Sequence, residues 1–410
     1  MREEARMASM KIKINENTCF YVALGLFYIM GVINETTLAE FTFTKIIVIL
    51  IRYSVIILLL IRFLQQKYTK LDLIKLGVIG SFFLLSYFRS GYFEMIMDLL
   101  FISAAKEIDF KKIAKETIII SAICILTIMA LAQANVIENI TMTSSRQYFF
   151  GDTSAQLWGF THHNFLGCRI LMCFICYIYI RFEKYGFKDF AFSILVFTFL
   201  YKVISSRTSA LLVAVTTFLI LLLKFLEFLE KRKSKPMVNV GLYSLMAFAP
   251  IFSLVVTLNY NTGNPVYLLL DGLIYRRFSY GQSIFSQYGF SFFGQRVELI
   301  SSLDAIRYGV DASILDNAYM YLFIKCGICI GFLVIFGWFL VAKMSIKRKN
   351  YNLAIIIAVY FICGISEKWL FTITYNPFVI LLSIGIYSKN NILVEFPGRA
   401  KQRLVSFIKQ

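Results

Sequence analysis

The stretch IIVILIRYSVIILLLI, residues 46–61, decides the fold class of this chain. Only Arg52 interrupts the apolar run with a charge, and Lys45 and Arg62 bound it on its two sides. An apolar run of this kind is typical of a helix that crosses the hydrocarbon core of a bilayer, which is about 30 Å thick. The stretch therefore predicts a membrane-spanning helix.

The composition of the whole chain agrees with this prediction. Of the 410 residues, 59% are hydrophobic and 16% are charged, and the mean hydropathy is +0.70. So few polar side chains cannot cover the surface of a water-soluble protein of this length. We expect an all-α integral membrane protein, a polytopic helical bundle that forms a single membrane domain over residues 1–410.

Similar apolar runs recur along the chain and predict about twelve membrane-spanning helices. Segment 92–105 is the weakest, because Glu94 and Asp98 interrupt it, and without it eleven helices remain. An odd number would place the two termini on opposite sides of the membrane. The expected spans lie near residues 18–33, 46–61, 71–88, 92–105, 116–135, 163–180, 190–204, 208–229, 237–258, 317–342, 351–366 and 369–387.

Lysine and arginine lie mainly in short hydrophilic stretches between the apolar runs, so the net charge of +18 does not indicate a nucleic-acid partner. With twelve helices, the stretches on one face hold 28 of the 42 basic residues, as the positive-inside rule expects of the cytoplasmic face. Both termini are then cytoplasmic. These stretches are residues 1–17, 62–70, 106–115, 181–189, 224–236, 343–350 and 388–410.

The eight cysteines fall inside or at the edges of apolar runs, which argues against a disulfide framework. Two pairs, Cys173/Cys176 and Cys326/Cys329, have the C-x-x-C spacing of some zinc sites. A structural zinc is disfavoured, because thiolates are costly in hydrocarbon and no histidine or acidic residue adjoins either pair. We expect neither a metal nor another cofactor.

Two connections on the face opposite the basic one are too long for simple turns, residues 136–162 and 259–316. Loops longer than about 15 residues are usually functional or disordered. The second loop is rich in tyrosine and phenylalanine, which predicts ordered structure packed on the membrane face. We expect one or two short amphipathic helices within residues 265–308.

Arginines on this outer face are the first candidates for binding a ligand. Arg276 and Arg277 are adjacent in the long loop, Arg296 follows in the same loop, and Arg207 lies in a short turn, SSRTS, between two apolar runs. A guanidinium group offers fork-shaped donors that match phosphate oxygens. Alternatively, these arginines pair with the carboxylates of the loop or with lipid phosphates.

The only two histidines, His162 and His163, are adjacent where an outer loop enters the predicted helix 163–180. A histidine can take up or release a proton near neutral pH, which makes either one a candidate acid or base. The alternative is that it caps the helix or forms a hydrogen bond with a neighbouring helix. Metal binding by the pair is disfavoured, because no third ligand is evident.

Three short motifs resemble those of Wzy-type polysaccharide polymerases, members of the O-antigen ligase/polymerase superfamily. They are GFTHHN at 159–164, SRT at 206–208, and LDNAY at 315–319, which closes the long loop. The order and the topology also match, and Phe293-Gly294 resembles a further element of the family. His163 stands where the family pattern more often has proline.

The resemblance implies glycosyl transfer without a metal at the outer face of the bacterial cytoplasmic membrane. The substrate would be an undecaprenyl-diphosphate-linked oligosaccharide, which serves as donor and as acceptor for capsular polysaccharide, exopolysaccharide or O-antigen. A flippase and a chain-length regulator are partners that the resemblance allows, besides membrane lipids. The sugar and its linkage are not encoded in any motif.

The reaction that the resemblance implies assigns roles to the outer residues. Charge develops on the leaving diphosphate, so Arg207, Arg276, Arg277 and Arg296 are the expected diphosphate ligands. His162 is the first choice for the base that takes the proton of the attacking hydroxyl, with Asp316 or Glu298 behind it. Asn164 and Asn317 are the expected supporting residues of their motifs.

Other functions remain open at this stage. A ligase of the same superfamily would move finished glycan from the same carrier to another acceptor, and the motifs do not separate the two. A flippase or other transporter would have a charged path within its helices and short outer loops, whereas here the long loop 259–316 lies outside. A membrane acyltransferase would need a histidine that faces the cytoplasm, and both histidines face away from it.

Overall fold

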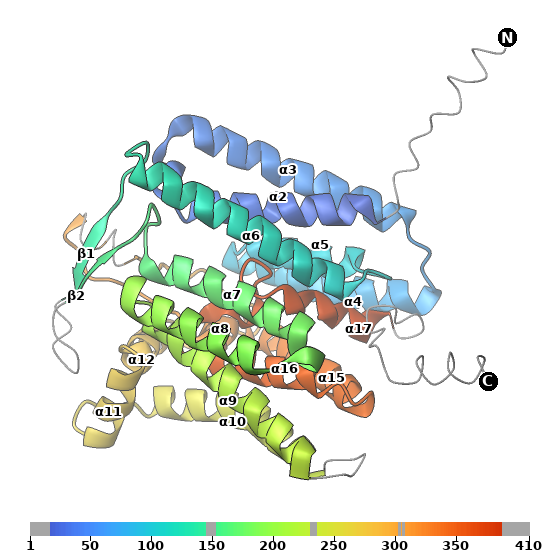
Figure 1. The fold of residues 1–410 in the computed structure, drawn as a ribbon. Helices are drawn as coiled ribbons and strands as arrows, with labels where there is room; N and C mark the ends of the chain where they lie inside the picture. Colours follow the sequence, from blue (N-terminus) through green and yellow to red (C-terminus); the bar gives the residue numbers. More distant parts are fainter. Residues whose placement is uncertain (1–16, 145–152, 230–235, 302–304, 306–307, 388–410) are drawn as a thin grey trace.

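A computed structural model of the chain describes residues 17–144, 153–229, 236–301, 305 and 308–387. The described chain is almost entirely helical, and most of the long helices run side by side, up and down along one direction (Figure 1). By length and composition, seven helices can cross a membrane, and three further apolar helical segments are shorter. The chain is therefore a multi-pass membrane protein, although the predicted count of about twelve spans is not confirmed.

The seven long apolar helices are α3 (Thr42–Gln65), α4 (Lys70–Ser90), α6 (Phe110–Gln133), α7 (His163–Arg181), α9 (Arg207–Leu229), α10 (Pro236–Leu258) and α15 (Ile328–Lys347). The shorter apolar segments are α2 (Thr18–Asn34), α16 (Tyr351–Cys363), and η6 (Pro377–Leu382) with α17 (Ser383–Ile386). The remaining helical elements are η1 (Thr37–Glu40), α5 (Glu94–Ala104), η2 (Phe182–Lys184), α8 (Phe187–Thr198), η3 (Phe199–Val203), α11 (Pro265–Leu273), α12 (Arg277–Tyr288), α14 (Ala318–Tyr321), η4 (Leu322–Cys326) and η5 (Lys368–Phe371).

The position of each helix follows from where its apolar side chains lie. Helix α3, which contains the stretch 46–61, exposes large side chains such as Phe43, Leu50 and Leu64. An exposed apolar surface of this kind is stable where lipid is the solvent. Helix α16 is instead buried at every position from Tyr351 to Phe361, as expected for a helix that is apolar all round and lies at the centre of a bundle.

Two of the predicted spans are broken in the structure. The predicted helix 317–342 runs through α14 and η4, stops at Gly327, whose φ is +101°, and continues as α15. The predicted helix 369–387 consists of η5, an irregular stretch, η6 and α17. Pro377 begins η6 and, having no N–H, cannot continue a helix from the residues before it. Hydropathy alone does not detect such breaks, because the side chains on both sides remain apolar.

Asp98 explains how an irregular stretch is tolerated inside the bundle. Its side chain is fully buried in α5, and Oδ1 accepts a hydrogen bond from the Ile373 N–H over 3.0 Å. Unwound backbone at membrane depth needs such a partner, because no water is at hand to bind its polar groups. The charge that made segment 92–105 a weak prediction is thus one of the groups that support the fold.

Both of the long loops, 136–162 and 259–316, contain regular structure among their described residues. Strands β1 (Thr141–Ser144) and β2 (Thr153–Gln156) form an antiparallel hairpin, with Thr141 opposite Gln156. In the longer loop, α11 and α12 confirm the expectation of short helices within residues 265–308. Figure 1 shows the hairpin, α11 and α12 at one end of the bundle, which we call the hairpin end.

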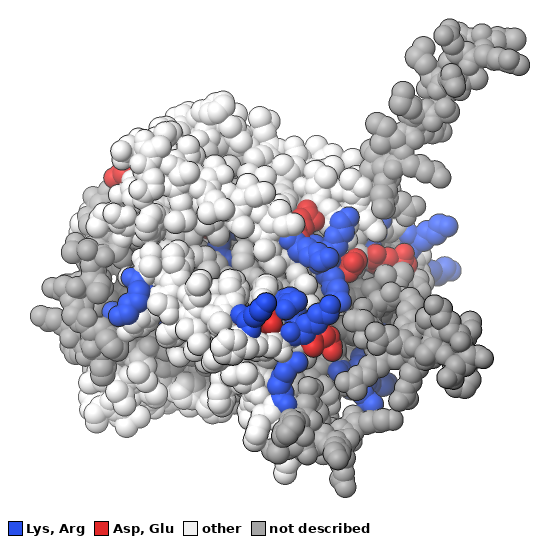
Figure 2. Space-filling model, viewed as in Figure 1, with Lys and Arg blue, Asp and Glu red and all other residues white. Residues whose placement is uncertain are grey.

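Basic residues gather at the opposite end of the bundle, which we call the lysine-rich end. The connections α3–α4, α5–α6, α7–α8 and α15–α16 meet there. Figure 2 shows most of the visible lysines and arginines at this end, while the side chains towards the hairpin end are mostly uncharged. This asymmetry agrees with the predicted basic face. The predicted cytoplasmic segments 1–17 and 388–410 lie outside the described residues except for Asn17.

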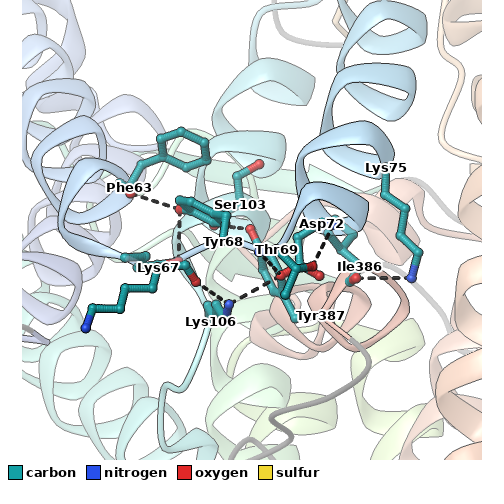
Figure 3. A network of polar contacts seen from close by, with 11 residues as sticks. Phe63, Lys67, Tyr68, Thr69, Asp72, Lys75, Ser103, Lys106, Ile386 and Tyr387 are labelled. Atoms are coloured by element: carbon teal, nitrogen blue, oxygen red, sulfur yellow. Dashed lines mark hydrogen bonds and ion pairs between the residues drawn. The ribbon is translucent and has the colours of Figure 1, made fainter.

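A buried polar network joins several connections at the lysine-rich end (Figure 3). The Lys106 ammonium lies 3.3 Å from Asp72 Oδ2, donates to the Lys67 carbonyl group, and lies 5.4 and 5.5 Å from the ring centroids of Tyr68 and Tyr387. A lysine with so many partners is stable although it is buried. The network fixes α17 against the α3–α4 and α5–α6 connections.

Candidate functional site

The N-terminal ends of α7 and α9 pack tightly at the hairpin end of the bundle. His162 is the N-cap of α7, and Arg207 begins α9. The Ser206 hydroxyl donates to the Asn164 side-chain oxygen over 3.4 Å. A Cβ atom on Gly167 would lie 2.1 Å from Ser206 Oγ, so this packing requires glycine. The predicted histidine motif and the predicted arginine turn therefore belong to one site.

The junction between α11 and α12 brings two further arginines to this site. Arg207 Nη1 donates to the Tyr275 hydroxyl over 3.2 Å, and Tyr275 directly precedes Arg276 and Arg277. Arg276 is exposed, and its guanidinium group lies 5.4 Å from the Tyr280 ring centroid. The side chain of Arg277 is only 12% exposed. The two adjacent arginines thus have different surroundings.

Arg277 is held by two carboxylates and a carbonyl group. Nη2 lies 2.8 Å from Asp316 Oδ2 and 3.9 Å from Glu367 Oε1, and Nε donates to the Ser366 carbonyl oxygen over 3.2 Å. For this arginine, the alternative that it pairs with a carboxylate of the loop is confirmed. The side chain of Asp316 is 23% exposed and that of Glu367 only 3%, so a ligand can reach Asp316 much more readily.

The two carboxylates also determine the charge of Arg277. Burial by itself lowers the pKa of the guanidinium group, but the negative charges of Asp316 and Glu367 outweigh this effect and raise the pKa above its usual value. The group therefore stays protonated at neutral pH and well above it. The site combines a permanent cation with a carboxylate that a ligand can reach.

His162 caps α7 with its ring. Nδ1 accepts a hydrogen bond from the Asn164 N–H over 3.1 Å, and the ring stacks on that of His163 with the centroids 4.2 Å apart. The capping alternative for a histidine is thus confirmed for His162. While Nδ1 accepts this hydrogen bond, a neutral imidazole carries its proton on Nε2. In this state the ring donates through Nε2 and does not accept a proton there.

Asn317 fixes the position of Asp316. Its Oδ1 accepts from the N–H groups of Tyr319 and Met320 over 3.1 and 3.2 Å, so that it caps α14. Its Nδ2 donates to Ser253 Oγ over 2.7 Å. These bonds anchor the end of the long loop to α10, and Asp316 lies one residue before the anchor.

Arg296 and Glu298 lie on another part of the long loop. Arg296 is exposed, and the backbone N–H of its neighbour Gln295 donates to the Lys325 carbonyl oxygen over 3.1 Å. The segment that carries both residues therefore packs on η4. No hydrogen bond or ion pair between described residues joins Arg296 to Arg277, whereas Arg277 pairs with Asp316 and Arg207 bonds to Tyr275, two residues before Arg277.

Left-handed backbone conformations are concentrated at the site. Trp158 lies just before the histidine motif, Ser205 just before Arg207, and Tyr275 and Arg276 just before Arg277, and their φ angles lie between 54° and 65°. They are four of the seven non-glycine residues with positive φ in the described chain. Such conformations are unfavourable for residues with a Cβ atom and tend to cluster at functional sites. In each of the three segments, an unfavourable backbone conformation therefore lies just before the candidate residues.

Comparisons with models of protein families, with curated proteins and with solved structures find no match. The resemblance to polysaccharide polymerases thus stays a prediction, and the chemistry of the site is argued from its geometry.

Two acidic residues of the site were not predicted, Glu367 and Glu35. Glu35 accepts from Arg169 through both oxygens, Nε to Oε2 over 2.6 Å and Nη2 to Oε1 over 2.8 Å, and Arg169 is fully buried. The Glu35 carbonyl oxygen also accepts from the N–H and the hydroxyl group of Thr161. This pair therefore positions the histidine motif. Nothing in the sequence pairs Glu35 with Arg169.

The described residues contain no group of three or more His, Cys, Asp and Glu side chains that could hold a metal ion. All eight cysteines are free thiols, and each is buried or half-buried.

Proposed function

We propose that this protein is a polysaccharide polymerase that extends a glycan carried on undecaprenyl diphosphate, at the outer face of a bacterial cytoplasmic membrane. The observation that carries the proposal is the convergence of Arg207, Arg277 and Asp316 at one end of the bundle, although they are far apart in the sequence. The resemblance of SRT at 206–208 and LDNAY at 315–319, which carry Arg207 and Asp316, to polymerase motifs supports it further. Both termini are then cytoplasmic.

The reaction is a single displacement at a sugar carbon. A hydroxyl group on the non-reducing sugar of one repeat unit attacks the anomeric carbon of the chain on the carrier. The new glycosidic bond forms as the bond between that carbon and the diphosphate breaks, and the hydroxyl proton passes to a base. The polymer grows by one repeat, and the lipid diphosphate is released.

The arginines stabilise the leaving diphosphate. Exposed Arg276 attracts it, and Arg207 and Arg277 bind it at the protein surface, where a fixed positive charge stabilises the negative charge that develops as the bond breaks. Arg277 keeps its charge because of its raised pKa, and its Nη1 makes no hydrogen bond to any described residue. A diphosphate oxygen can bind there without displacing Asp316.

Asp316 takes the proton of the attacking hydroxyl. It is the more accessible carboxylate, and the 2.8 Å ion pair with Arg277 holds it in a fixed orientation. The capping state of His162 favours a different role for that residue, in which Nε2 donates a hydrogen bond to a substrate oxygen. We therefore assign the role of the base to Asp316 instead of His162, which was the first choice from the sequence.

A ligase of the same superfamily remains the second candidate, because the same arginines and carboxylate would transfer a finished glycan to another acceptor. A flippase is disfavoured by the position of the site, since its charged groups lie at the hairpin end.

The proposal is tested by incubating the purified protein with a lipid-diphosphate repeat unit alone and separating the products by length on a gel. We expect a ladder of lengths, with and without EDTA, since the resemblance implies a reaction without a metal. Transfer only after a foreign acceptor is added would indicate the ligase. Movement of the lipid across a vesicle membrane without a ladder would refute the polymerase.

Two matched variants test the base. Asp316→Asn removes the proton acceptor and keeps its shape, so we expect the ladder to form about 10²- to 10⁴-fold more slowly. Asp311→Asn changes an exposed acidic residue of the same loop and should leave the rate unchanged. Equal melting temperatures of the two variants would show that the loss is not a folding defect. A wild-type rate for Asp316→Asn would rule out Asp316 as the base.

A further inference from the structure

Lys325 and Lys368 form a second cluster of positive charge next to the proposed active site. The Lys325 ammonium lies 5.6 Å from the ring centroid of Tyr92 and 5.5 Å from that of Tyr321, and the Lys368 ammonium lies 5.7 Å from the same Tyr321 ring. Both lysines are half-buried. We call these four residues the paired-lysine site.

The two ammonium groups have no anionic partner among the residues that the structure describes. Within the described part of the chain, neither Nζ lies within 4.0 Å of a carboxylate oxygen and neither forms a hydrogen bond. Glu94 is close enough to attract Lys325 electrostatically, while Lys368 repels it. Two half-buried like charges without an ion pair are unfavourable in a membrane protein and usually mark a functional site.

A small cavity opens beside these charges. Lys368, Tyr92, Tyr321 and Phe371 are among the residues that line it. The two tyrosine rings meet edge to face, with centroids 5.3 Å apart. Lysine ammonium groups bind phosphate as point charges, and tyrosine hydroxyl groups can donate to phosphate oxygens. The cavity itself has room for only about one water molecule, so it can take a single phosphate oxygen, while the two ammonium groups beside it supply the positive charge that a phosphate group needs.

The backbone of Lys325 is fixed by the Phe293-Gly294 element. A Cβ atom on Gly294 would lie 2.9 Å from the Lys325 carbonyl oxygen, and Ser86 Oγ donates to the Cys326 carbonyl oxygen over 2.5 Å. On the other side, a Cβ atom on Gly327 would lie 2.3 Å from Gly294 N. Contacts this close hold η4 in place at the point where the helix breaks, which positions the ammonium.

The paired-lysine site and the Arg277 site are built on the same two chain segments. Asp316 is followed two residues later by Ala318, which lines the cavity, and Glu367 is followed directly by Lys368. Two cationic sites side by side suit a reaction that joins two substrates, each of which carries a diphosphate.

We infer that the paired-lysine site binds a phosphate group of the second lipid-linked substrate, the acceptor, while Arg207, Arg276 and Arg277 bind that of the donor. The identity of this ligand rests on the proposed function. The positive charge of the paired-lysine site is an observation that does not depend on the proposed function.

The test counts the molecules of undecaprenyl diphosphate that bind to the protein in nanodiscs of phosphatidylcholine, by native mass spectrometry. We expect two for the wild type. Lys325→Met/Lys368→Met should bind one and lose at least about tenfold in affinity for the second, because two charged contacts to phosphate are removed. Lys325→Arg/Lys368→Arg, which keeps the charges, should still bind two.

Lys202→Met is the matched control. Lys202 also lies over a tyrosine, 5.5 Å from the Tyr201 ring centroid, but it is exposed. This variant should bind two molecules. Two molecules bound by Lys325→Met/Lys368→Met, or one by the wild type, would overturn the inference.

Two competitors separate the sources of the phosphate group. Phosphatidylglycerol at the same concentration, or inorganic phosphate in the millimolar range, should not displace the second molecule. Displacement by either would overturn the assignment to a second substrate. If no ladder forms but the lysine variant still loses one bound molecule, the polymerase fails and the phosphate site stands. If a ladder forms and the variant still binds two, only this inference fails.

Discussion

Arg169 and Glu35 are a buried ion pair on which the position of the histidine motif depends. Arg169 Nη1 is buried without a hydrogen-bond partner, so even the intact pair is not fully satisfied. A buried pair contributes little net stability compared with apolar residues, but a single buried charge left behind is strongly destabilising. The two halves of the pair should therefore be strongly coupled.

A double-mutant cycle tests this coupling. Glu35→Met leaves Arg169 without its carboxylate and should lower the free energy of unfolding by about 3–5 kcal/mol. Glu35→Met/Arg169→Met should recover most of the loss, because no charge is left buried. The measurement is the thermal stability of each variant in detergent, together with that of Arg169→Met. Additive losses in the double variant would contradict the coupling.

Single residues were predictable where a motif surrounds them, and unpredictable where only the fold supplies the partner. His162, Arg207 and Asp316 stand in short motifs, and the structure brings the three segments together. Glu35 and Glu367 are single carboxylates near the ends of apolar helices, and nothing in the sequence pairs them with Arg169 or Arg277. Such pairs form only after distant helices have packed.

At the scale of elements, the breaks in the predicted spans matter most. The turn at Gly327 lets the chain leave η4 and start α15, with Gly294 packed against it. Two glycines at positive φ interlock here, because any side chain on either would collide with the backbone of the other segment. The Phe293-Gly294 element is therefore a packing element for η4.

Alanine substitutions at matched glycines test this packing. Gly327→Ala adds a Cβ atom 2.3 Å from Gly294 N at a φ of +101°, so both backbone strain and a clash are expected. Gly289→Ala, in the loop that carries Gly294, has a φ of +64° and no atom within 4 Å, so only the backbone strain of about 1–3 kcal/mol remains. We expect a clearly larger fall in melting temperature for Gly327→Ala. Equal falls would show that the interlock contributes nothing.

Long apolar helices were predicted to within a few residues, as for α7 and α10, because a continuous hydrophobic run of that length has few other structures in lipid. The irregular stretch between η5 and η6 was not predicted. The backbone N–H of Ile373 in this stretch donates to Asp98, which lies 275 residues earlier in the sequence. Local hydropathy contains no information about such a partner.

At the scale of the whole molecule, the two ends of the bundle differ in charge and in structure. The lysine-rich end has short connections and a buried lysine network, while the hairpin end has the two long connections and the candidate site (Figures 1 and 2). Basic residues are retained on the cytoplasmic side of bacterial and other membranes. The proposed function therefore requires the hairpin end to face out of the cell.

Cysteine labelling in intact cells tests this orientation. Asn261 lies in the exposed turn between α10 and α11, and Lys188 is exposed near the start of α8 at the opposite end. A membrane-impermeant maleimide should label Asn261→Cys in whole cells and Lys188→Cys only after the membrane is permeabilised. The wild type is the background control, since its eight cysteines are buried or half-buried. The reverse pattern would place Arg277 and Asp316 on the cytoplasmic side, whereas the proposed reaction takes place at the outer face of the membrane. That result would refute the proposed polymerase without any assay of activity.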